Sequence, residues 1–155
     1  MQKTLVIFKP SAMERGCVGQ ILTRFQQKGL IISGLKMMRL DEAILREHYS
    51  HLLEKPFFPI LLKTMMASPV IVACLAGVDV INVVRMMTGA TNGRDAQPGT
   101  IRGDFAMSNQ ENIIHASSSA EDADAEIRRF FKPEEIFEWT PAYMDFIYST
   151  LEIDD

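Results

Sequence analysis

Hydrophobic positions along the chain form short continuous runs separated by segments in which they recur with a longer period. Three continuous runs, at 4–8, 30–39 and 70–76, are rich in β-branched and apolar residues and predict buried strands. A fourth run, at 112–117, predicts a short strand that ends on His115, where small polar residues follow. Four strands are therefore expected.

Between these runs the apolar residues take the spacing of one helix face. Val18, Ile21, Leu22 and Phe25 predict a helix that Gly29 ends. The same reasoning predicts helices that begin after Asp41, over 57–66, after Asp79 as N-cap, and at the capping-box-like segment 119–122. The resulting order is β, α, β, α, α, β, α, loop, β, α.

This order predicts an α+β fold rather than a doubly wound parallel sheet. Without the helical pair between 41 and 66, two βαβ-type units remain, as in a ferredoxin-like βαββαβ sandwich with helices over one face of a four-stranded antiparallel sheet. The pair is then an inserted helical hairpin. A doubly wound sheet is the alternative, but no glycine fingerprint follows the first strand. We expect one domain over 1–155.

Composition narrows the class of protein. The chain has 155 residues, is 47% hydrophobic and carries a formal net charge of −4, which argues against overall attraction to nucleic acid or an anionic membrane. Cys17 and Cys74 are far apart and are expected to be reduced. The longest later apolar run, 69–78, is about half the length of a membrane-spanning helix, so we expect a soluble, cytoplasmic protein.

The segment 88–110 lacks periodicity and contains spaced glycines and a proline, which indicates an ordered functional loop. Arg85 precedes this segment, Thr91, Arg94 and Arg102 lie among its glycines, and guanidinium groups suit bidentate contact with phosphate. From spacing alone, an anion site and plain surface charge are equally good interpretations.

Adding Lys9 at the end of the first strand and His115 changes this balance. Alone, His115 is more readily interpreted as a structural histidine. Beside a basic cluster it becomes a candidate nucleophile, because neutral imidazole can accept a phosphoryl group and release it again. The sequence contains no P-loop, H-E-x-x-H or C-x-x-C motif, and we expect His48 and His51 to be exposed rather than metal ligands.

Several motifs, taken in order along nearly the whole chain, resemble those of nucleoside diphosphate kinases. They are 4–10, 15–19, 48–49, 55–58, 98–105 and 112–115. The resemblance implies a ferredoxin-like fold and transfer of the γ-phosphate of a nucleoside triphosphate, such as ATP or GTP, to a nucleoside diphosphate. It also implies a ping-pong route through phosphohistidine, with Mg²⁺ held mainly through the nucleotide phosphates and no protein metal ligand.

The resemblance assigns roles residue by residue. His115 matches the phosphorylated histidine, supported by Ser117 and Glu126, and Tyr49 lies near it. The nucleotide-binding set is Lys9 and Asn112 for the ribose hydroxyls and phosphates, Arg85, Thr91 and Arg102 for the phosphates, and Phe57 for stacking on the base. A flat aromatic accepts any base, so broad base tolerance is expected.

Three positions depart from the family pattern: Ala116 replaces a usual Gly, Ser118 a usual Asp, and Ala90 a common acidic residue. The alternative is therefore a catalytically weakened nucleotide-binding regulatory or scaffold homologue. A third hypothesis is a ferredoxin-like domain that binds an unrelated anion. The family forms tetramers or hexamers, and the aromatic tail at 137–148 is expected to pack on its own domain or on another subunit of a homo-oligomer.

Overall fold

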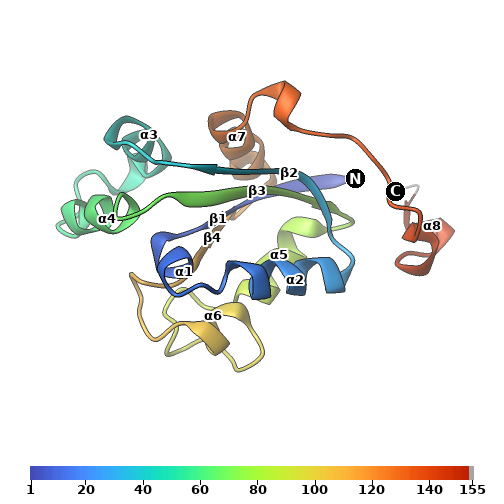
Figure 1. Cartoon of the computed structure of the whole chain (residues 1–155), viewed down its shortest axis with the longest axis horizontal. Coiled ribbons are helices and arrows are strands. Elements are labelled where there is room, and N and C mark those ends of the chain that lie inside the picture. The colour runs from blue at the N-terminus through green and yellow to red at the C-terminus, as the bar shows by residue number, and fades with distance from the viewer. Residues whose placement is uncertain (154–155) are drawn as a thin grey trace.

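A computed structural model describes residues 1–153 and contains one four-stranded sheet (Figure 1). Its strands are β1 (Gln2–Phe8), β2 (Ile31–Met38), β3 (Val70–Gly77) and β4 (Ile114–Ala116). The spatial order is β2-β3-β1-β4, and every neighbouring pair is antiparallel. The ferredoxin-like arrangement predicted from the element order is confirmed.

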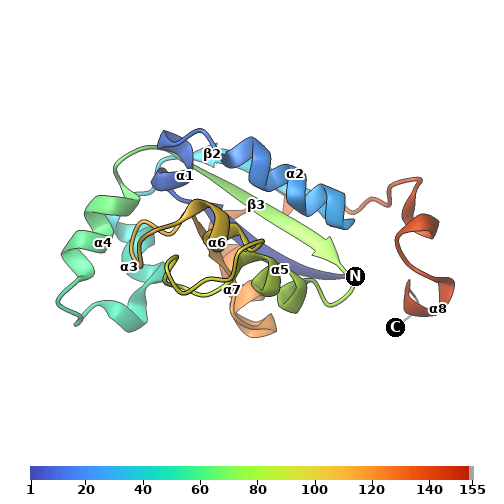
Figure 2. The same ribbon diagram turned by 90° about the horizontal axis from the view of Figure 1, so that it is seen from below.

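One face of the sheet is covered by the two crossover helices, α2 (Val18–Lys28) and α5 (Val80–Thr88), together with short helices α1 (Pro10–Glu14) and α6 (Ile101–Phe105) (Figures 1 and 2). Val6 and Phe8 of β1 point into this layer and are fully buried.

The opposite face is also covered, by α3 (Glu42–His48), a 3₁₀ turn at Ser50–Leu52, α4 (Phe58–Met65) and α7 (Ala120–Phe130) (Figure 1). Leu5 and Ile7 point into this second core. The expectation of helices over one face was therefore incomplete. Burial on both faces explains why the strands read as continuous apolar runs rather than as alternating patterns.

Local end signals position most helices as predicted. Gly29 ends α2 with a left-handed φ of 101°, and the Asp41 carboxylate accepts from Ile44 N at 2.9 Å at the start of α3. Ser119 accepts from Asp122 N at the start of α7. Asp79 occupies the N-cap position of α5 as predicted, but it has φ 52° and its carboxylate accepts from Asn82 Nδ2 rather than from a backbone N–H of the helix.

The segment between α5 and β4 is ordered, and it contains α6, which the sequence pattern did not predict. A five-residue helix is too short to display a period. A Cβ on Gly103 would lie 1.9 Å from Gln97 O, so only glycine permits this close packing. Asp104 further anchors the segment, since it accepts from Gly99 N and pairs with Arg24 at 2.7 Å.

The chain enters β4 through a strained residue. Ile113 is fully buried and has φ 77°, an outlier for a β-branched side chain. Lys9 N donates to its carbonyl and its own N–H donates to Ser11 Oγ, so both backbone groups are held. The strand that was predicted to run from Asn112 to His115 is therefore shorter and shifted along the chain. It begins at Ile114 and has His115 at its centre, opposite Ile7, rather than at its end.

The chain after α7 forms short 3₁₀ turns at Pro133–Glu135 and Met144–Phe146 and the helix α8 (Thr150–Ile153), beyond the C-terminal end of α2 (Figures 1 and 2). Met144 packs on Ile31 of β2, so part of the tail lies against its own domain as predicted. Phe146 remains 90% exposed. Within residues 1–153, no helix combines the length and apolar character needed to cross a bilayer.

Candidate active site

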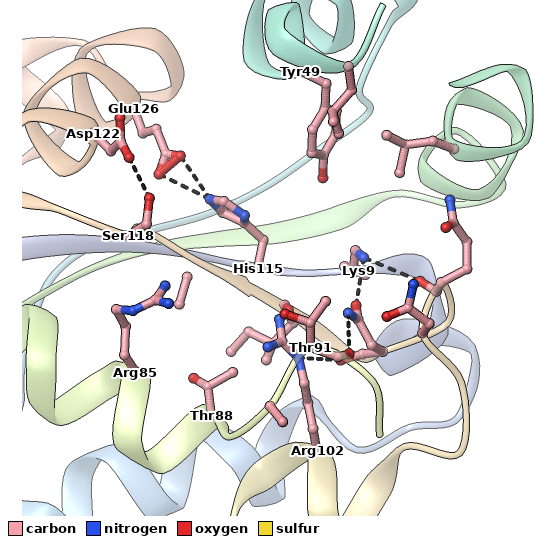
Figure 3. Close-up of a pocket in the computed structure, with 18 of the residues that line it drawn as sticks. Lys9, Tyr49, Arg85, Thr88, Thr91, Arg102, His115, Ser118, Asp122 and Glu126 are labelled. Carbon is pink, nitrogen blue, oxygen red and sulfur yellow. Dashed lines mark hydrogen bonds and ion pairs between the residues drawn. The ribbon is translucent and has the colours of Figure 1, made fainter. Parts of the chain in front are cut away.

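A cleft of about 890 Å³ is lined by residues of β4, α4, α5, α6 and α7, by Lys9 directly after β1 and by Tyr49 directly after α3. Its volume suits a small-molecule ligand. The predicted site residues that line it are Lys9, Tyr49, Phe57, Arg85, Thr91, Arg102, Asn112, His115 and Glu126. Ser117 lies fully buried behind them. Figure 3 shows His115 between Glu126 and Lys9, with Arg85 and Arg102 on the side away from Tyr49.

His115 is oriented by a carboxylate from the neighbouring helix. Its Nε2 lies 3.0 and 2.8 Å from the two oxygens of Glu126 on α7 (Figure 3). An ionised carboxylate only accepts hydrogen bonds, so the His115 proton is assigned to Nε2. Nδ1 then carries the free lone pair. The neutral ring is thus prepared to act as a nucleophile through Nδ1.

Ser117 holds Glu126 in place. Its hydroxyl donates to Glu126 Oε1 at 2.6 Å and accepts from Leu5 N at 3.3 Å, which ties the pair to β1. Burial opposes charge on Glu126, but the hydrogen bond and charge of His115, followed by the Ser117 hydroxyl, lower its pKa below the ordinary value. Glu126 therefore stays ionised at neutral pH and keeps accepting from His115.

At the other side of the cleft, Asn112 connects three segments. Its Oδ1 accepts from Lys9 Nζ at 2.7 Å, and its Nδ2 donates to Thr91 O at 2.9 Å (Figure 3). Burial, and then the charge of Arg102, lower the pKa of Lys9 to about 8, although Glu111 opposes the shift. Lys9 is thus a desolvated cation at neutral pH, held in place for an anionic ligand.

Arg102 both holds neighbouring backbone segments together and places a positive charge in the cleft. Its guanidinium donates to the carbonyls of Gly89, Asn112 and Ile114 at 3.1, 3.2 and 2.6 Å. A guanidinium has five N–H groups, so two remain for a ligand. Arg85 is exposed at the end of α5, as its position off the apolar stripe predicted, and adds a second fixed charge. The basic end of the cleft can bind phosphate without a P-loop.

The mouth of the cleft is aromatic and apolar. Phe57 precedes α4 and is 40% exposed, so its ring face is available for stacking. Leu61 and Leu52 also line the cleft. Tyr49, deeper in the cleft, is buried, and burial followed by the Glu126 charge raises the pKa of its hydroxyl, which stays protonated and able to donate.

Of the three arginines for which an anion site and surface charge were equally good interpretations, Arg85 and Arg102 line the cleft, whereas Arg94 is exposed and does not. One prediction about an individual residue was wrong. His48 is buried, not exposed, with its ring centroid 4.6 Å from that of His115. His51 is exposed as predicted. The position of His48 on the same helix face as Ile44 and Leu45 was the signal for its burial.

Other cleft residues were not singled out from the sequence. Arg129 and Asp122 on α7 and Thr88 on α5 all line the cleft. Arg129 follows Glu126 by three positions and so shares its face of α7, which was the available signal. Asp122 and Thr88 had none beyond their proximity to residues already chosen.

One cluster has the composition of a transition-metal site. His48, His115 and Glu126 each place a ligand atom within 4.8 Å of the others. However, the Arg129 guanidinium already donates to His48 Nδ1 at 2.9 Å, so a cation of the chain itself occupies this group. Over residues 1–153, Asp122 and Glu126 are the carboxylates that line the cleft, and Glu126 is engaged by His115 and Ser117.

Comparison with known proteins agrees with this geometry. The family model described as nucleoside diphosphate kinase matches residues 2–136. The chain is 58% identical over 139 residues to a nucleoside diphosphate kinase of Parabacteroides distasonis, covering 90% of this chain and 91% of that protein. It is 43% identical over 147 residues to nucleoside diphosphate kinase B of Bos taurus, covering 95% and 97%.

The fold agrees equally well. The structure of the Halobacterium salinarum nucleoside diphosphate kinase in complex with CDP superposes with a TM-score of 0.92 at 38% identity, covering 96% of this chain and 99% of that one. The family match extends over most of the sequence and the fold match over nearly all of it. The chain therefore belongs to the nucleoside diphosphate kinase family.

Proposed function

We propose that His115 is the phosphoryl acceptor in the reaction of this nucleoside diphosphate kinase, the transfer of the γ-phosphate from a nucleoside triphosphate to a nucleoside diphosphate. The observation that carries the proposal is the pair of contacts from His115 Nε2 to Glu126. These contacts leave Nδ1 as the nucleophilic nitrogen in a cleft whose other end is basic.

The reaction proceeds in two half-reactions. The Nδ1 lone pair attacks the γ-phosphorus, the bond from phosphorus to the β–γ bridging oxygen breaks, and the nucleoside diphosphate leaves with that electron pair. A terminal oxygen of a second nucleoside diphosphate then attacks the phosphohistidine, and the N–P bond breaks to regenerate the neutral ring. Throughout, Glu126 holds the proton on Nε2 and stabilises the positive charge that develops on the imidazole.

The remaining site residues bind and orient the nucleotide. Lys9, Arg85, Arg102 and Thr91 would contact phosphate oxygens, and Lys9 with Asn112 would also reach the ribose hydroxyls. Tyr49 lies beside the histidine and can donate to the γ-phosphate. Phe57 at the mouth would stack on the base, and stacking reads the flat π-face rather than the base edge.

We further propose Mg²⁺ as the cofactor, held mainly through the nucleotide phosphates. The donor set fits, because Asp122 supplies an exposed oxygen ligand for the hydration shell of a hard cation and accepts the Ser118 hydroxyl (Figure 3). When bound, Mg²⁺ neutralises charge on the transferring phosphates. The protein residues themselves orient the γ-phosphorus toward His115.

The regulatory-homologue alternative is not favoured. The three departures leave the nucleophile and its supports in place. Ala116 of β4 pairs with Val6 of β1, and Ala90 is an exposed residue of the cleft. Ser118 retains a link to a carboxylate through Asp122. We expect turnover to be retained.

We also propose a cytoplasmic homo-oligomer, tetramer or hexamer, in which residues 1–155 act as one kinase domain. The edge strand β2 exposes Leu35 and Met37, at 49% and 61%, and the tail exposes Phe146. An exposed edge strand is a typical surface for pairing with another chain, and large exposed apolar side chains favour such a contact. Light scattering of the purified chain would count the subunits, and a monomer would contradict the proposal.

Labelled ATP tests the phosphoryl acceptor. The protein should acquire acid-labile, base-stable label that GDP or UDP removes, and His115→Asn should acquire none. His51→Asn removes the other histidine at the cleft and should still be labelled. Absence of label in the unmodified protein, or its persistence in His115→Asn, would disprove the proposed role.

A further inference from the structure

Two histidines face the same carboxylate oxygen in this site. His115 Nε2 lies 2.8 Å from Glu126 Oε2, and His48 Nδ1 lies 3.8 Å from that same oxygen. His48 is held by packing, with ring centroids 4.6 Å from Tyr49, 4.6 Å from His115 and 5.1 Å from Phe130, all edge to face. A small rotation of its ring would bring Nδ1 within hydrogen-bonding distance of Glu126.

Arg129 determines whether His48 Nδ1 carries a lone pair or a proton. Its Nη1 donates to His48 Nδ1 at 2.9 Å, and its Nε lies 3.3 Å from Glu47 on α3. A guanidinium carries only donors and remains protonated, so His48 Nδ1 must carry a lone pair and the ring proton must lie on Nε2. In this state His48 has no proton to donate from Nδ1 to Glu126.

The surroundings of His48 agree with a neutral ring. Burial, and then the charges of His115, Arg129 and His51, lower its pKa to about 3, although Glu126 opposes the shift. Its Nε2 is buried without a hydrogen-bond partner in the described part of the chain. That unsatisfied donor indicates that the tautomer is imposed by Arg129 at the other nitrogen rather than chosen by a partner at Nε2.

We propose that Arg129 is a positioning residue that reserves Glu126 for His115 by keeping the Nδ1 lone pair of His48 occupied. Without Arg129, His48 can carry its proton on Nδ1 and donate to Glu126 Oε2, in competition with His115. The His115 proton is then no longer confined to Nε2, and the reactive lone pair is divided between its two ring nitrogens. This inference rests on the proposed role of His115 as phosphoryl acceptor.

The kinetic test uses Arg129→Met, which keeps the apolar stem and removes the donors. The single-turnover rate of phosphorylation by ATP should fall about tenfold or more, since a misplaced proton removes the nucleophile, whereas the KM for ATP should change little. Arg128→Met is the matched control, because it removes an exposed guanidinium from the same helix turn without touching His48, and its rate should not change.

The decisive comparison is a double variant. Arg129→Met with His48→Phe removes both the residue that holds His48 and the ring that would compete with His115 for Glu126. The phosphorylation rate of the double variant should therefore recover most of the loss seen in Arg129→Met alone. If Arg129 only stabilised the fold, the double variant would be as slow as the single variant, and that result would overturn the proposal. Circular dichroism of each variant would confirm that α7 is intact.

A spectroscopic measurement separates this inference from the proposed function. In protein containing ¹⁵N-labelled histidine, the ring couplings of His115 should report a single Nε2–H tautomer, and Arg129→Met should convert it to a mixture. An unchanged tautomer in that variant overturns the proposal, whatever the rate. Label that persists in His115→Asn would instead refute the role of His115 as acceptor.

Discussion

Lys9, just after β1, donates to Asn112, just before β4, over 2.7 Å, and this contact joins two segments that are 103 residues apart. It holds a buried ammonium group at the phosphate end of the cleft with a neutral partner. No carboxylate neutralises Lys9 by direct contact within residues 1–153. The charge of Lys9 is therefore sensitive to pH and available to a phosphate.

The affinity for nucleotides should consequently fall as the pH becomes alkaline. With the pKa of Lys9 lowered to about 8, the residue is charged below pH 8 and neutral above it. The affinity for ADP should stay constant below about pH 7 and fall about tenfold between pH 7 and pH 9, because binding then requires uptake of a proton. Titration calorimetry can measure this, and Lys9→Gln should abolish the dependence.

The free energy of unfolding should rise with pH, whereas the nucleotide affinity falls. The ordinary Lys pKa of 10.5 lies above the value in the folded protein, so between about pH 8 and 10.5 the unfolded chain binds more protons. The free energy of unfolding contributed by Lys9 therefore rises with pH in that window. Urea unfolding at pH 7.5 and 9.5 would measure this change for the unmodified chain and for Lys9→Gln. The increase in the free energy of unfolding should be larger in the unmodified chain.

Removing the charge behind His115 should slow phosphorylation more than removing the hydroxyl that supports it. Glu126→Gln replaces an anionic group that only accepts hydrogen bonds by a neutral amide that can also donate, so the tautomer is no longer fixed, and we expect a loss of about 10²-fold in the phosphorylation rate. Ser117→Ala leaves Glu126 in contact with His115 and should cost about tenfold. Quenched-flow measurement of the phosphoenzyme would rank the two, and equal losses would contradict this order.

Asp122 should affect the requirement for Mg²⁺ rather than the nucleophile. It lines the cleft, and in residues 1–153 it is the lining carboxylate that His115 does not engage. Asp122→Asn should raise the Mg²⁺ concentration needed for half-maximal rate severalfold, whereas saturating Mg²⁺ should restore the rate. Asp124→Asn, on the same helix but outside this cleft, is the control. Mn²⁺ titration of the ADP complex, followed by electron paramagnetic resonance, would measure the affinity independently of turnover.

Phe57 should contribute binding energy without selecting among bases. Phe57→Ala should raise the KM for ADP, GDP and UDP by about tenfold each, because base stacking is worth about 1–3 kcal/mol and is tolerant of sequence. Phe57→Trp, which keeps a flat ring, should remain close to the unmodified enzyme. A selective loss for one base would show that the ring does more than stack.

The close packing of the segment between α5 and β4 makes a stability prediction. A methyl group on Gly103 would overlap Gln97 O, so Gly103→Ala should destabilise the fold by about 1–3 kcal/mol. Gly19 in α2 is the matched control. A Cβ there meets nothing within 4 Å, and Gly19→Ala should stabilise by about 0.5–1 kcal/mol through helix propensity. Thermal unfolding of both variants would test the contrast.

The sequence patterns located elements well where a local signal exists. Gly29 and Asp41 mark helix ends through glycine freedom and side-chain capping, and both lie where predicted. The start of β4 was misjudged because nothing in an apolar run reveals that Ile113 has positive φ. That conformation is imposed by tertiary hydrogen bonds, which no local period records.

The same distinction holds for the site. His48 was expected to be exposed because charged residues adjoin it in sequence, yet helical geometry turns it inward while Arg46 and Glu47 stay outside. Arg129 was missed because an arginine in the last turn of a helix normally faces solvent. The family resemblance supplied which residues meet at the cleft. The contacts among them, such as the three carbonyls that bind Arg102, arise from the tertiary fold and leave no pattern in the sequence.

The backbone conformation of Ile113 fixes the chain beside the phosphate end of the cleft. Hydrogen bonds to Lys9 and Ser11 hold both of its backbone groups, so the neighbouring Asn112 is presented from a restrained backbone. Phe57 lies instead at the exposed mouth of the cleft. The protein thus holds most firmly the residues that meet the phosphates, which all nucleotides share, and leaves exposed the residue that meets the base, in which they differ.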